Sequence, residues 1–148
     1  MKLKHKVALI TGASSGVGNA IANTFASNGY DVVLAARRIE ILKQLSDKFS
    51  EQYKVKALPI KADLAIEADI ENLFRKTSDE FGRLDVLVNV AGNFQDLSFV
   101  NSSVSEFIES YKISRQLMLD SVIYACKFGL DMIIKNKGVI INISSDAG

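Results

Sequence analysis

A short stretch near the N-terminus, Lys6–Gly18, places the strongest constraint on what this chain can fold into. Four consecutive apolar residues, Val7 to Ile10, run directly into a loop of small residues with glycines at positions 12, 16 and 18. The chain then turns amphipathic at helical spacing, which predicts a buried strand, a glycine-rich turn and a helix. Glycine permits backbone angles closed to other residues and leaves the amides accessible. Because the first amides of a helix lack internal partners and favour anions, the stretch predicts a phosphate-binding site.

The rest of the chain alternates apolar strands with amphipathic helices. The predicted strands cover residues 7–10, 31–36, 55–60, 85–90 and 138–145. The predicted helices lie between them, around residues 17–28, 41–49, 66–81 and 103–135, and the last one starts with a capping-box pattern. Continuously apolar strands are typical of a sheet covered on both faces. The predicted fold class is therefore α/β, a doubly wound parallel sheet in one domain over residues 1–148, with Pro59 placing the third strand at an edge.

Composition narrows the function classes. Hydrophobic residues make up 48% of the chain and charged residues 24%, which suits a globular domain, and the net charge of +1 gives no reason to expect a nucleic-acid partner. The single cysteine, Cys126, fits a reducing compartment, and with His5 as the one histidine we expect neither a metal site nor a cysteine nucleophile. No apolar run approaches the roughly 18 residues of a membrane span. We expect a cytoplasmic protein.

Polar residues follow the predicted strands where each strand ends. They are Thr11 to Gly18, Arg37 and Arg38, Asp63, Asn89 to Gly92, and Ser144 and Ser145. In open parallel sheets ligands bind beyond these ends, where the strand order reverses. The glycine loop alone could be only a tight turn, and its spacing is G-x-x-x-G-x-G, not the common G-x-G-x-x-G. Its setting between strand and helix favours nucleotide binding.

The end of the second strand distinguishes the two nicotinamide cofactors. An NAD site usually carries an acidic residue about 20 residues after the glycines, which binds the ribose 2′-hydroxyl. Here Ala36 is followed by Arg37 and Arg38. A guanidinium pairs with a 2′-phosphate, which an acid would repel. The two arginines could be merely solvated, but their placement favours NADP over NAD.

Four motifs, in this order along the chain, resemble those of the short-chain dehydrogenase/reductase family. They are Thr11–Gly18, Asp63-Leu64, Asn89-Val90-Ala91-Gly92 and Asn142-Ile143-Ser144-Ser145. The resemblance covers the whole chain. It implies a Rossmann-like fold and hydride transfer between NADP(H) and a small carbonyl or alcohol substrate.

The resemblance also implies a role for each matching residue. The loop would hold the pyrophosphate and the adenosine ribose through Gly12, Ser14, Ser15, Gly16, Val17 and Gly18. Arg37 and Arg38 would meet the 2′-phosphate, and Asp63 with Leu64 would border the adenine. The floor beneath the nicotinamide ribose would consist of Asn89, Ala91 and Gly92.

Ser145 matches the family's catalytic serine, which hydrogen-bonds the reacting carbonyl or hydroxyl. Two of the other matches also have a structural reading. Asp63 could cap a helix, and Asn89 could make a hydrogen bond at a strand end. Each reading is compatible with the functional role.

Three departures from the family pattern bear on activity. The family's Y-x-x-x-K pair, whose lysine lowers the tyrosine's pKa for proton transfer, is absent. The residues four positions after the tyrosines are Leu34, Ala57, Arg115 and Phe128. Relative to the family, we expect the domain to be truncated after the fifth strand, before that pair. Val90 replaces an asparagine, and Met118 stands where the long helix normally carries another.

Three hypotheses stay open at this point. The first is an NADP-dependent oxidoreductase in its full-length form. The second is an NADP-binding module without catalysis, since the tyrosine–lysine pair is missing. The third is a pseudo-enzyme that serves as an interaction partner, because the fifth strand would be an apolar edge. We also expect a homo-oligomer formed through the long helix.

Overall fold

The computed structural model describes residues 5–90, 92 and 100–144 and has alternating strands and helices. In chain order the elements are β1 (Val7–Thr11), α1 (Gly16–Ser27), β2 (Asp31–Ala36), α2 (Ile39–Tyr53), β3 (Ala57–Lys61), α3 (Glu67–Phe81), β4 (Val86–Asn89), α4 (Val104–Arg115), the π-helical segment η1 (Gln116–Asp120), α5 (Ser121–Lys135) and β5 (Val139–Asn142). The strands form one parallel sheet in the order β3-β2-β1-β4-β5. This confirms the predicted doubly wound, Rossmann-like α/β fold.

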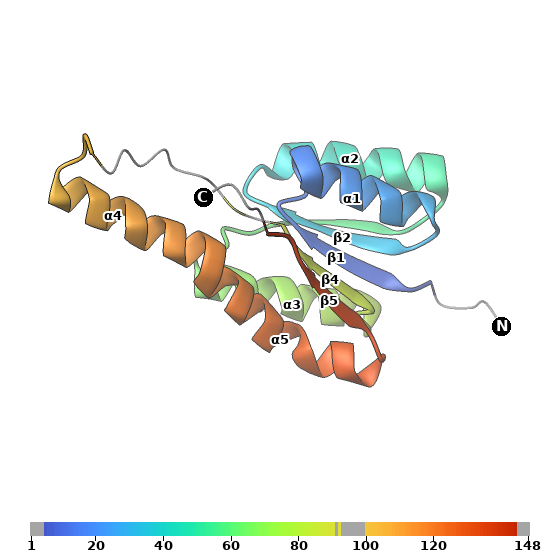
Figure 1. Cartoon of the computed structure of the whole chain (residues 1–148). Coiled ribbons are helices and arrows are strands. Elements are labelled where there is room, and N and C mark those ends of the chain that lie inside the picture. The colour runs from blue at the N-terminus through green and yellow to red at the C-terminus, as the bar shows by residue number, and fades with distance from the viewer. Residues whose placement is uncertain (1–4, 91, 93–99, 145–148) are drawn as a thin grey trace.

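Helices cover both faces of the sheet (Figure 1). On one face, buried residues of α1 and α2 such as Ala22, Leu42 and Phe49 pack with the side chains of β1 and β2 that point toward them. On the other face, Ile70 and Phe74 of α3 pack in one cluster with residues of α5 and the opposite side chains of the strands. Because β1 is buried along its whole length, it forms the centre of the domain.

The third strand is at the edge of the sheet, as Pro59 predicted. It begins at Ala57 and not at Val55. The preceding helix α2 runs to Tyr53, and Lys54 then adopts a left-handed conformation with φ 60°. This turn occupies the residues between the helix and the strand, so pairing with β2 starts later than the apolar pattern predicted.

The predicted long helix is present, but it contains a π-helical segment. Its capping box is confirmed: the Ser103 side chain accepts a bond from the Glu106 N–H, and the Glu106 side chain accepts one from the Ser103 N–H. Over Gln116–Asp120 the backbone adds a residue to the turn. The Ser121 hydroxyl donates to the Leu117 carbonyl at 2.6 Å at the end of this segment.

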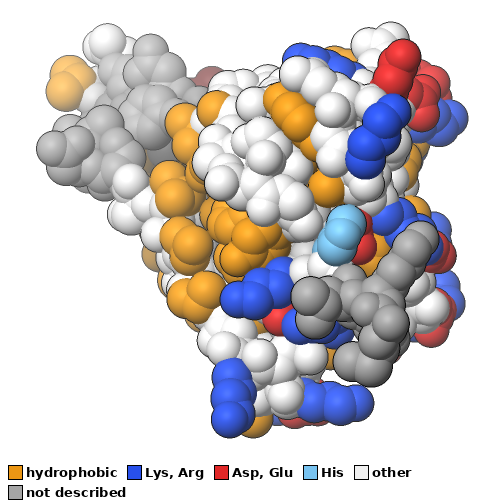
Figure 2. All heavy atoms as spheres, turned by 90° about the vertical axis from the view of Figure 1, so that its right-hand side faces the viewer, with side chains coloured by type: hydrophobic (Ala, Val, Ile, Leu, Met, Phe, Trp, Pro, Cys, Tyr) orange, Lys and Arg blue, Asp and Glu red, His pale blue; other side chains and the backbone are white. Residues whose placement is uncertain are grey.

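Several apolar side chains lie exposed along the long helix and β5. Helix α4 has no buried residue and extends away from the sheet (Figure 1). The exposed large apolar residues here include Val104, Ile108, Tyr111, Ile123, Leu130, Ile134, Val139, Ile141 and Ile143. Figure 2 shows hydrophobic side chains grouped along one margin of the face it presents. None of the helices in the described ranges combines the length and the apolar character that crossing a membrane requires.

Candidate functional site

The glycine loop connects the buried strand β1 to the N-terminus of α1. Gly12 and Gly16 have φ values of 66° and 52°, which favour glycine. At Gly18 a Cβ would lie 2.3 Å from the Gly12 carbonyl oxygen, so only glycine allows the helix to start this close to the loop. The N-cap residue Ser15 makes no side-chain capping bond, and the first turn of α1 carries no acidic residue. The positive end of this helix is therefore not neutralised by its own side chains.

Arg38 extends from the end of β2 across the glycine loop. Its Nε and Nη2 atoms lie 3.3 and 3.0 Å from the Ser14 hydroxyl, and Nη2 also donates to the Ser14 carbonyl at 3.3 Å. Arg37 beside it is exposed. Two guanidinium groups therefore stand next to a helix N-terminus. This combination of donors suits a phosphorylated ligand.

Asp63 follows β3 in a turn that leads to α3. Its Oδ1 atom accepts a bond from the Ala65 N–H at 3.0 Å, and its own N–H donates to the Asp69 carboxylate at 2.8 Å. The Asp63 carboxylate thus shapes the turn before the helix but does not cap it as its structural reading predicted, because the N-cap residue of α3 is Ile66. The side chain remains half-exposed, so this role leaves it accessible.

Side chains join neighbouring strands where the strand order reverses. The Thr11 hydroxyl, 1% exposed as a residue, contacts the Val88 carbonyl at 3.4 Å and accepts from the Val90 N–H at 3.0 Å. Asn89 bonds to Asn142 of β5. These contacts hold the carboxyl ends of β1, β4 and β5 in register, which is where a ligand of such a sheet binds.

A cavity of about 750 Å³ lies at these strand ends and brings the predicted residues together. Its lining includes every described residue predicted for the site: Gly12, Ser14, Ser15, Gly16, Val17, Gly18, Arg37, Arg38, Asp63, Leu64, Asn89 and Gly92. Ala91 and the predicted catalytic Ser145 lie outside the described residues. Within the described ranges, no group of three or more His, Cys, Asp and Glu residues is placed to hold a metal ion.

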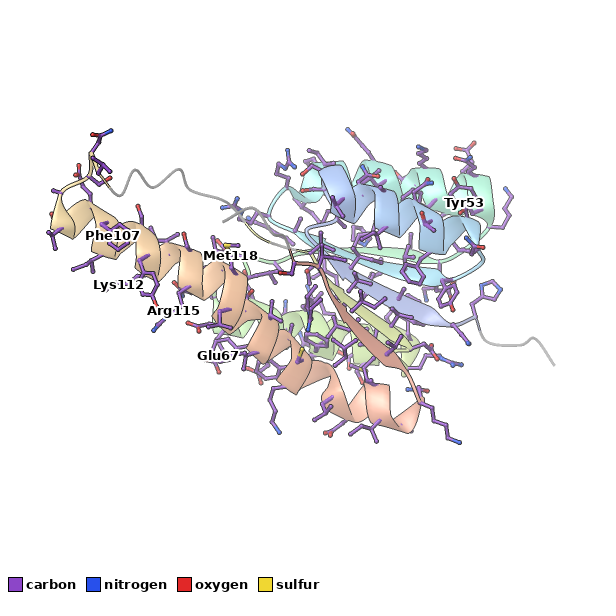
Figure 3. The ribbon with its side chains drawn as sticks, viewed as in Figure 1. Tyr53, Glu67, Phe107, Lys112, Arg115 and Met118 are labelled. Carbon is purple, nitrogen blue, oxygen red and sulfur yellow. The ribbon has the colours of Figure 1, made fainter. Side chains whose placement is uncertain are left out.

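The cavity also has lining residues for which no individual role was predicted. They are Ala36, Ala62, Val90, Leu117, Met118, Val122, Ile143 and Ser144. Met118 belongs to η1, is 52% exposed, and has its Cγ 3.9 Å from where a Cβ of Gly92 would be. Figure 3 shows Met118 where the long helix passes the end of the sheet, whereas Phe107 and Lys112 lie on the projecting α4. Leu117 and Val122 carried no sequence signal. Met118 was noted through the family alignment, and Val90, Ile143 and Ser144 belong to the motifs at the strand ends.

Cys126 lies on the long helix and contacts a residue of the site. No role in the site was predicted for Cys126, and it is half-buried on α5 with its sulfur 3.7 Å from the Asn89 Nδ2 atom. It therefore lies behind the cavity floor. Sequence alone gave no signal for this contact because the two residues are 37 positions apart.

Comparison with known proteins assigns the chain to a family. A family model described as short chain dehydrogenase matches residues 6–148. Glycine betaine reductase of Emericella nidulans is 34% identical over 99% of this chain, which corresponds to 11% of that protein. Human 15-hydroxyprostaglandin dehydrogenase [NAD(+)] is 37% identical over 100% of this chain and 53% of its own length.

A solved structure agrees with these sequence matches. The crystal structure of L-sorbose reductase from Gluconobacter frateurii, complexed with NADPH and L-sorbose, is 28% identical and superposes with a TM-score of 0.89. The match covers 99% of this chain and 54% of that one. The chain thus spans about half the length of the human and Gluconobacter proteins. With the family model matching nearly all of its residues, the chain belongs to the short chain dehydrogenase family.

Proposed function

We propose that this chain binds NADP(H) and is the cofactor-binding part of an oxidoreductase that interconverts a small carbonyl and an alcohol. Bound NADPH would supply a hydride. The chain's own residues hold the phosphates, the adenine and the nicotinamide ribose in the cavity at the strand ends. Ser145 remains our candidate for the hydrogen bond to the reacting oxygen.

The observation that carries this proposal is the shared cavity. Residues from six separate segments of the sequence line one space of about 750 Å³ beyond the ends of the sheet. Its donors are chemically suited to a nucleotide, because backbone amides at a helix N-terminus and two guanidinium groups all favour phosphate. Gly16 adds a further fit: a Cβ there would meet nothing within 4 Å, so the loop surface is open at that point.

The arginines support NADP as the preferred cofactor. Ala36 ends β2 without the carboxylate that would bind a ribose 2′-hydroxyl, and Arg38 is already held against Ser14 of the loop. Relatives use both cofactors by name: the human dehydrogenase is described with NAD(+), and the Gluconobacter reductase was crystallised with NADPH. The choice for this chain therefore rests on its own residues.

Binding measurements with paired cofactors test the proposal. We expect the unmodified chain to bind NADPH more tightly than NADH. Arg38→Ala should weaken the affinity for NADPH by about tenfold and leave the affinity for NADH almost unchanged, since charge-assisted bonds contribute about 1.5–3 kcal/mol. Arg75→Ala, on the exposed surface of α3, is the matched control. Equal affinity for the two cofactors in the unmodified chain would remove the case for NADP.

A second candidate is an NADP-binding module without catalysis. It is favoured by a sequence observation: none of the four tyrosines has a lysine four positions later. The two candidates predict different turnover. NADPH oxidation with a panel of ketones and aldehydes by a longer protein that contains this chain, lost in Ser145→Ala, would support the enzyme, and binding without turnover by that longer protein would support the module.

Two further parts of the proposal concern the whole protein. We propose that residues 1–148 form a single domain that works in the cytoplasm, in line with the one cysteine. We also propose that two copies associate through the long helix. The exposed apolar residues of α4 and α5 support this, because exposed apolar patches favour contact with another chain.

A further inference from the structure

Two asparagines and a cysteine form a polar cluster behind the cavity floor. Asn89, at the end of β4, donates from Nδ2 to the Asn142 Oδ1 atom at 2.8 Å and to the Cys126 Sγ atom at 3.7 Å. Asn142 is the direct neighbour of Asn89 across the β4–β5 ladder, and Cys126 comes from α5. Both hydrogens of one amide group are therefore engaged, which fixes the plane of the Asn89 side chain.

This arrangement also fixes the position of the Oδ1 atom of the same Asn89 amide. Asn89 is only 4% exposed, yet it lines the cavity. Its Oδ1 atom accepts no bond from the described residues, where every fully buried polar side-chain atom has a partner. That oxygen is therefore not fully buried, and it belongs to a side chain that lines the cavity.

We propose that Asn142 is a positioning residue for the cofactor: it holds Asn89 so that the Asn89 Oδ1 atom is presented to the nicotinamide-ribose end of the ligand. Cys126 supports the same amide from α5. The inference rests on the NADP binding proposed above. A carbonyl oxygen only accepts hydrogen bonds, so the matching ligand group is a hydroxyl or an amide N–H.

The backbone around this cluster strengthens the assignment. The Ile143 N–H donates to the Asn89 carbonyl at 2.9 Å, and Ile143 and Ser144 both line the cavity. Asn142 thus connects β4, which carries Asn89, to the segment that leads to the predicted catalytic serine. Without its side-chain oxygen, the Asn89 amide would lose its shorter bond and could turn its nitrogen toward the ligand.

Two ligands separate this role from a general effect on folding. NADPH reaches the whole cavity, whereas 2′,5′-ADP carries the adenosine and 2′-phosphate groups without the nicotinamide ribose. We expect Asn142→Ala to weaken NADPH by about tenfold and 2′,5′-ADP by less than about twofold, in keeping with the loss of a hydrogen bond. Asn72→Ala on α3 is the control for replacing an asparagine, and thermal unfolding checks the fold of each variant.

Cys126 gives an independent second pair of variants. Cys126→Ser keeps an acceptor beside Asn89 and should retain NADPH affinity, while Cys126→Ala should weaken it in the same direction as Asn142→Ala. Equal losses for NADPH and 2′,5′-ADP, or no loss for either, would overturn the positioning role. If the unmodified chain binds 2′,5′-ADP but NADPH no more tightly, this inference fails and the adenosine half of the proposed site stands. If it binds neither, the proposed function itself fails, and this inference with it.

Discussion

Asp85 precedes β4 at the end of the sheet opposite the cavity, and it is the most strongly bonded buried carboxylate described. It accepts from the Val7 N–H at 2.8 Å and from Nε and Nη2 of Arg83 at 2.9 and 2.6 Å. Burial disfavours its charge, but the bonds from Arg83 and Val7 and the charges of Arg83 and Lys6 outweigh that effect. The pKa of Asp85 therefore lies below its ordinary value.

This lowered pKa predicts how stability depends on pH. A carboxyl group with a depressed pKa in the folded state stabilises the fold above its unfolded pKa, about 3.9, and loses that contribution as the pH falls through the folded value. We expect Asp85→Asn to lower the free energy of unfolding at pH 7 by about 3 kcal/mol and to flatten its pH dependence below about pH 4. Urea unfolding at several pH values measures both effects.

A matched variant controls for the general effect of removing a charge. Asp79 pairs with Arg75 on the surface of α3, with side-chain exposures of 65% and 61%. Asp79→Asn should change stability by less than about 0.5 kcal/mol, because exposed pairs contribute little. If Asp85→Asn were as stable as the unmodified chain at neutral pH, the Asp85 cluster would not hold the ends of β1 and β4 as described.

Two glycines of the loop should respond differently to the same substitution. Gly18→Ala places a methyl group 2.3 Å from a backbone oxygen, which cannot move without distorting the loop, whereas at Gly16 the methyl meets open space and only the φ of 52° is unfavourable. We expect the free energy of unfolding to fall by about 3 kcal/mol in Gly18→Ala and by about 1 kcal/mol in Gly16→Ala. Thermal unfolding of both variants measures the difference, and equal losses would contradict the close approach at Gly18.

At the scale of the elements, the long helix shows what an apolar pattern predicts and what it leaves out. Ser103 and Glu106 identify its start because the capping box is a local interaction between neighbours in sequence. The π-helical segment at Gln116–Asp120 was not predicted, since the apolar pattern does not show where a turn gains a residue. The segment also contacts a distant part of the chain: the Gln116 side chain donates to the Ala65 carbonyl, 51 residues away, at 2.6 Å.

The capping box should govern local opening of α4 more than the stability of the domain. Because α4 buries no residue, Ser103→Ala removes bonds that only its first turn uses. We expect amide hydrogen exchange in that turn to become about fivefold faster, while exchange in β1 stays unchanged. Ser110→Ala, within the same helix, should not accelerate exchange.

The pKa of Glu106 provides a second readout of the same cap. The hydrogen bonds from the Ser103 side chain and then from its N–H lower this pKa. The cap is therefore intact above the unfolded pKa of Glu106, about 4.3, and weakens as the pH falls through the lower folded value. Uniform exchange rates along α4 across this pH range would argue against the cap as the local anchor.

At the scale of the whole molecule, the site residues at the strand ends could be predicted from the sequence, whereas the helix residues that line the cavity could not. Parallel strands bring their carboxyl ends to one edge, so polar residues scattered along the chain converge once the sheet is known. Leu117 and Val122 could not be assigned to the cavity in this way, because the path of a helix over the sheet depends on packing. The Asn89 contacts with Asn142 and Cys126 depend on the same three-dimensional placement.

The exposed apolar surfaces lead us to predict that copies of the chain associate. The β5 edge carries Val139 and Ile141 at 50% and 37% exposure, and α5 carries Ile123 at 54% and Ile134 at 65%. Such surfaces favour contact with another chain, so we expect reversible association at micromolar concentrations. Sedimentation velocity over a concentration series measures it.

Two lysine substitutions show which surface associates. Ile123→Lys places a charge on the helix and Ile141→Lys places one on the sheet edge, and both side chains are exposed enough for the fold to tolerate the change. If copies pair through the long helix, Ile123→Lys produces monomers and Ile141→Lys does not, because only the first charge is desolvated at the contact. The opposite result would transfer the contact to β5, where a lysine blocks strand pairing. A chain that sediments as a monomer at every concentration would contradict both modes.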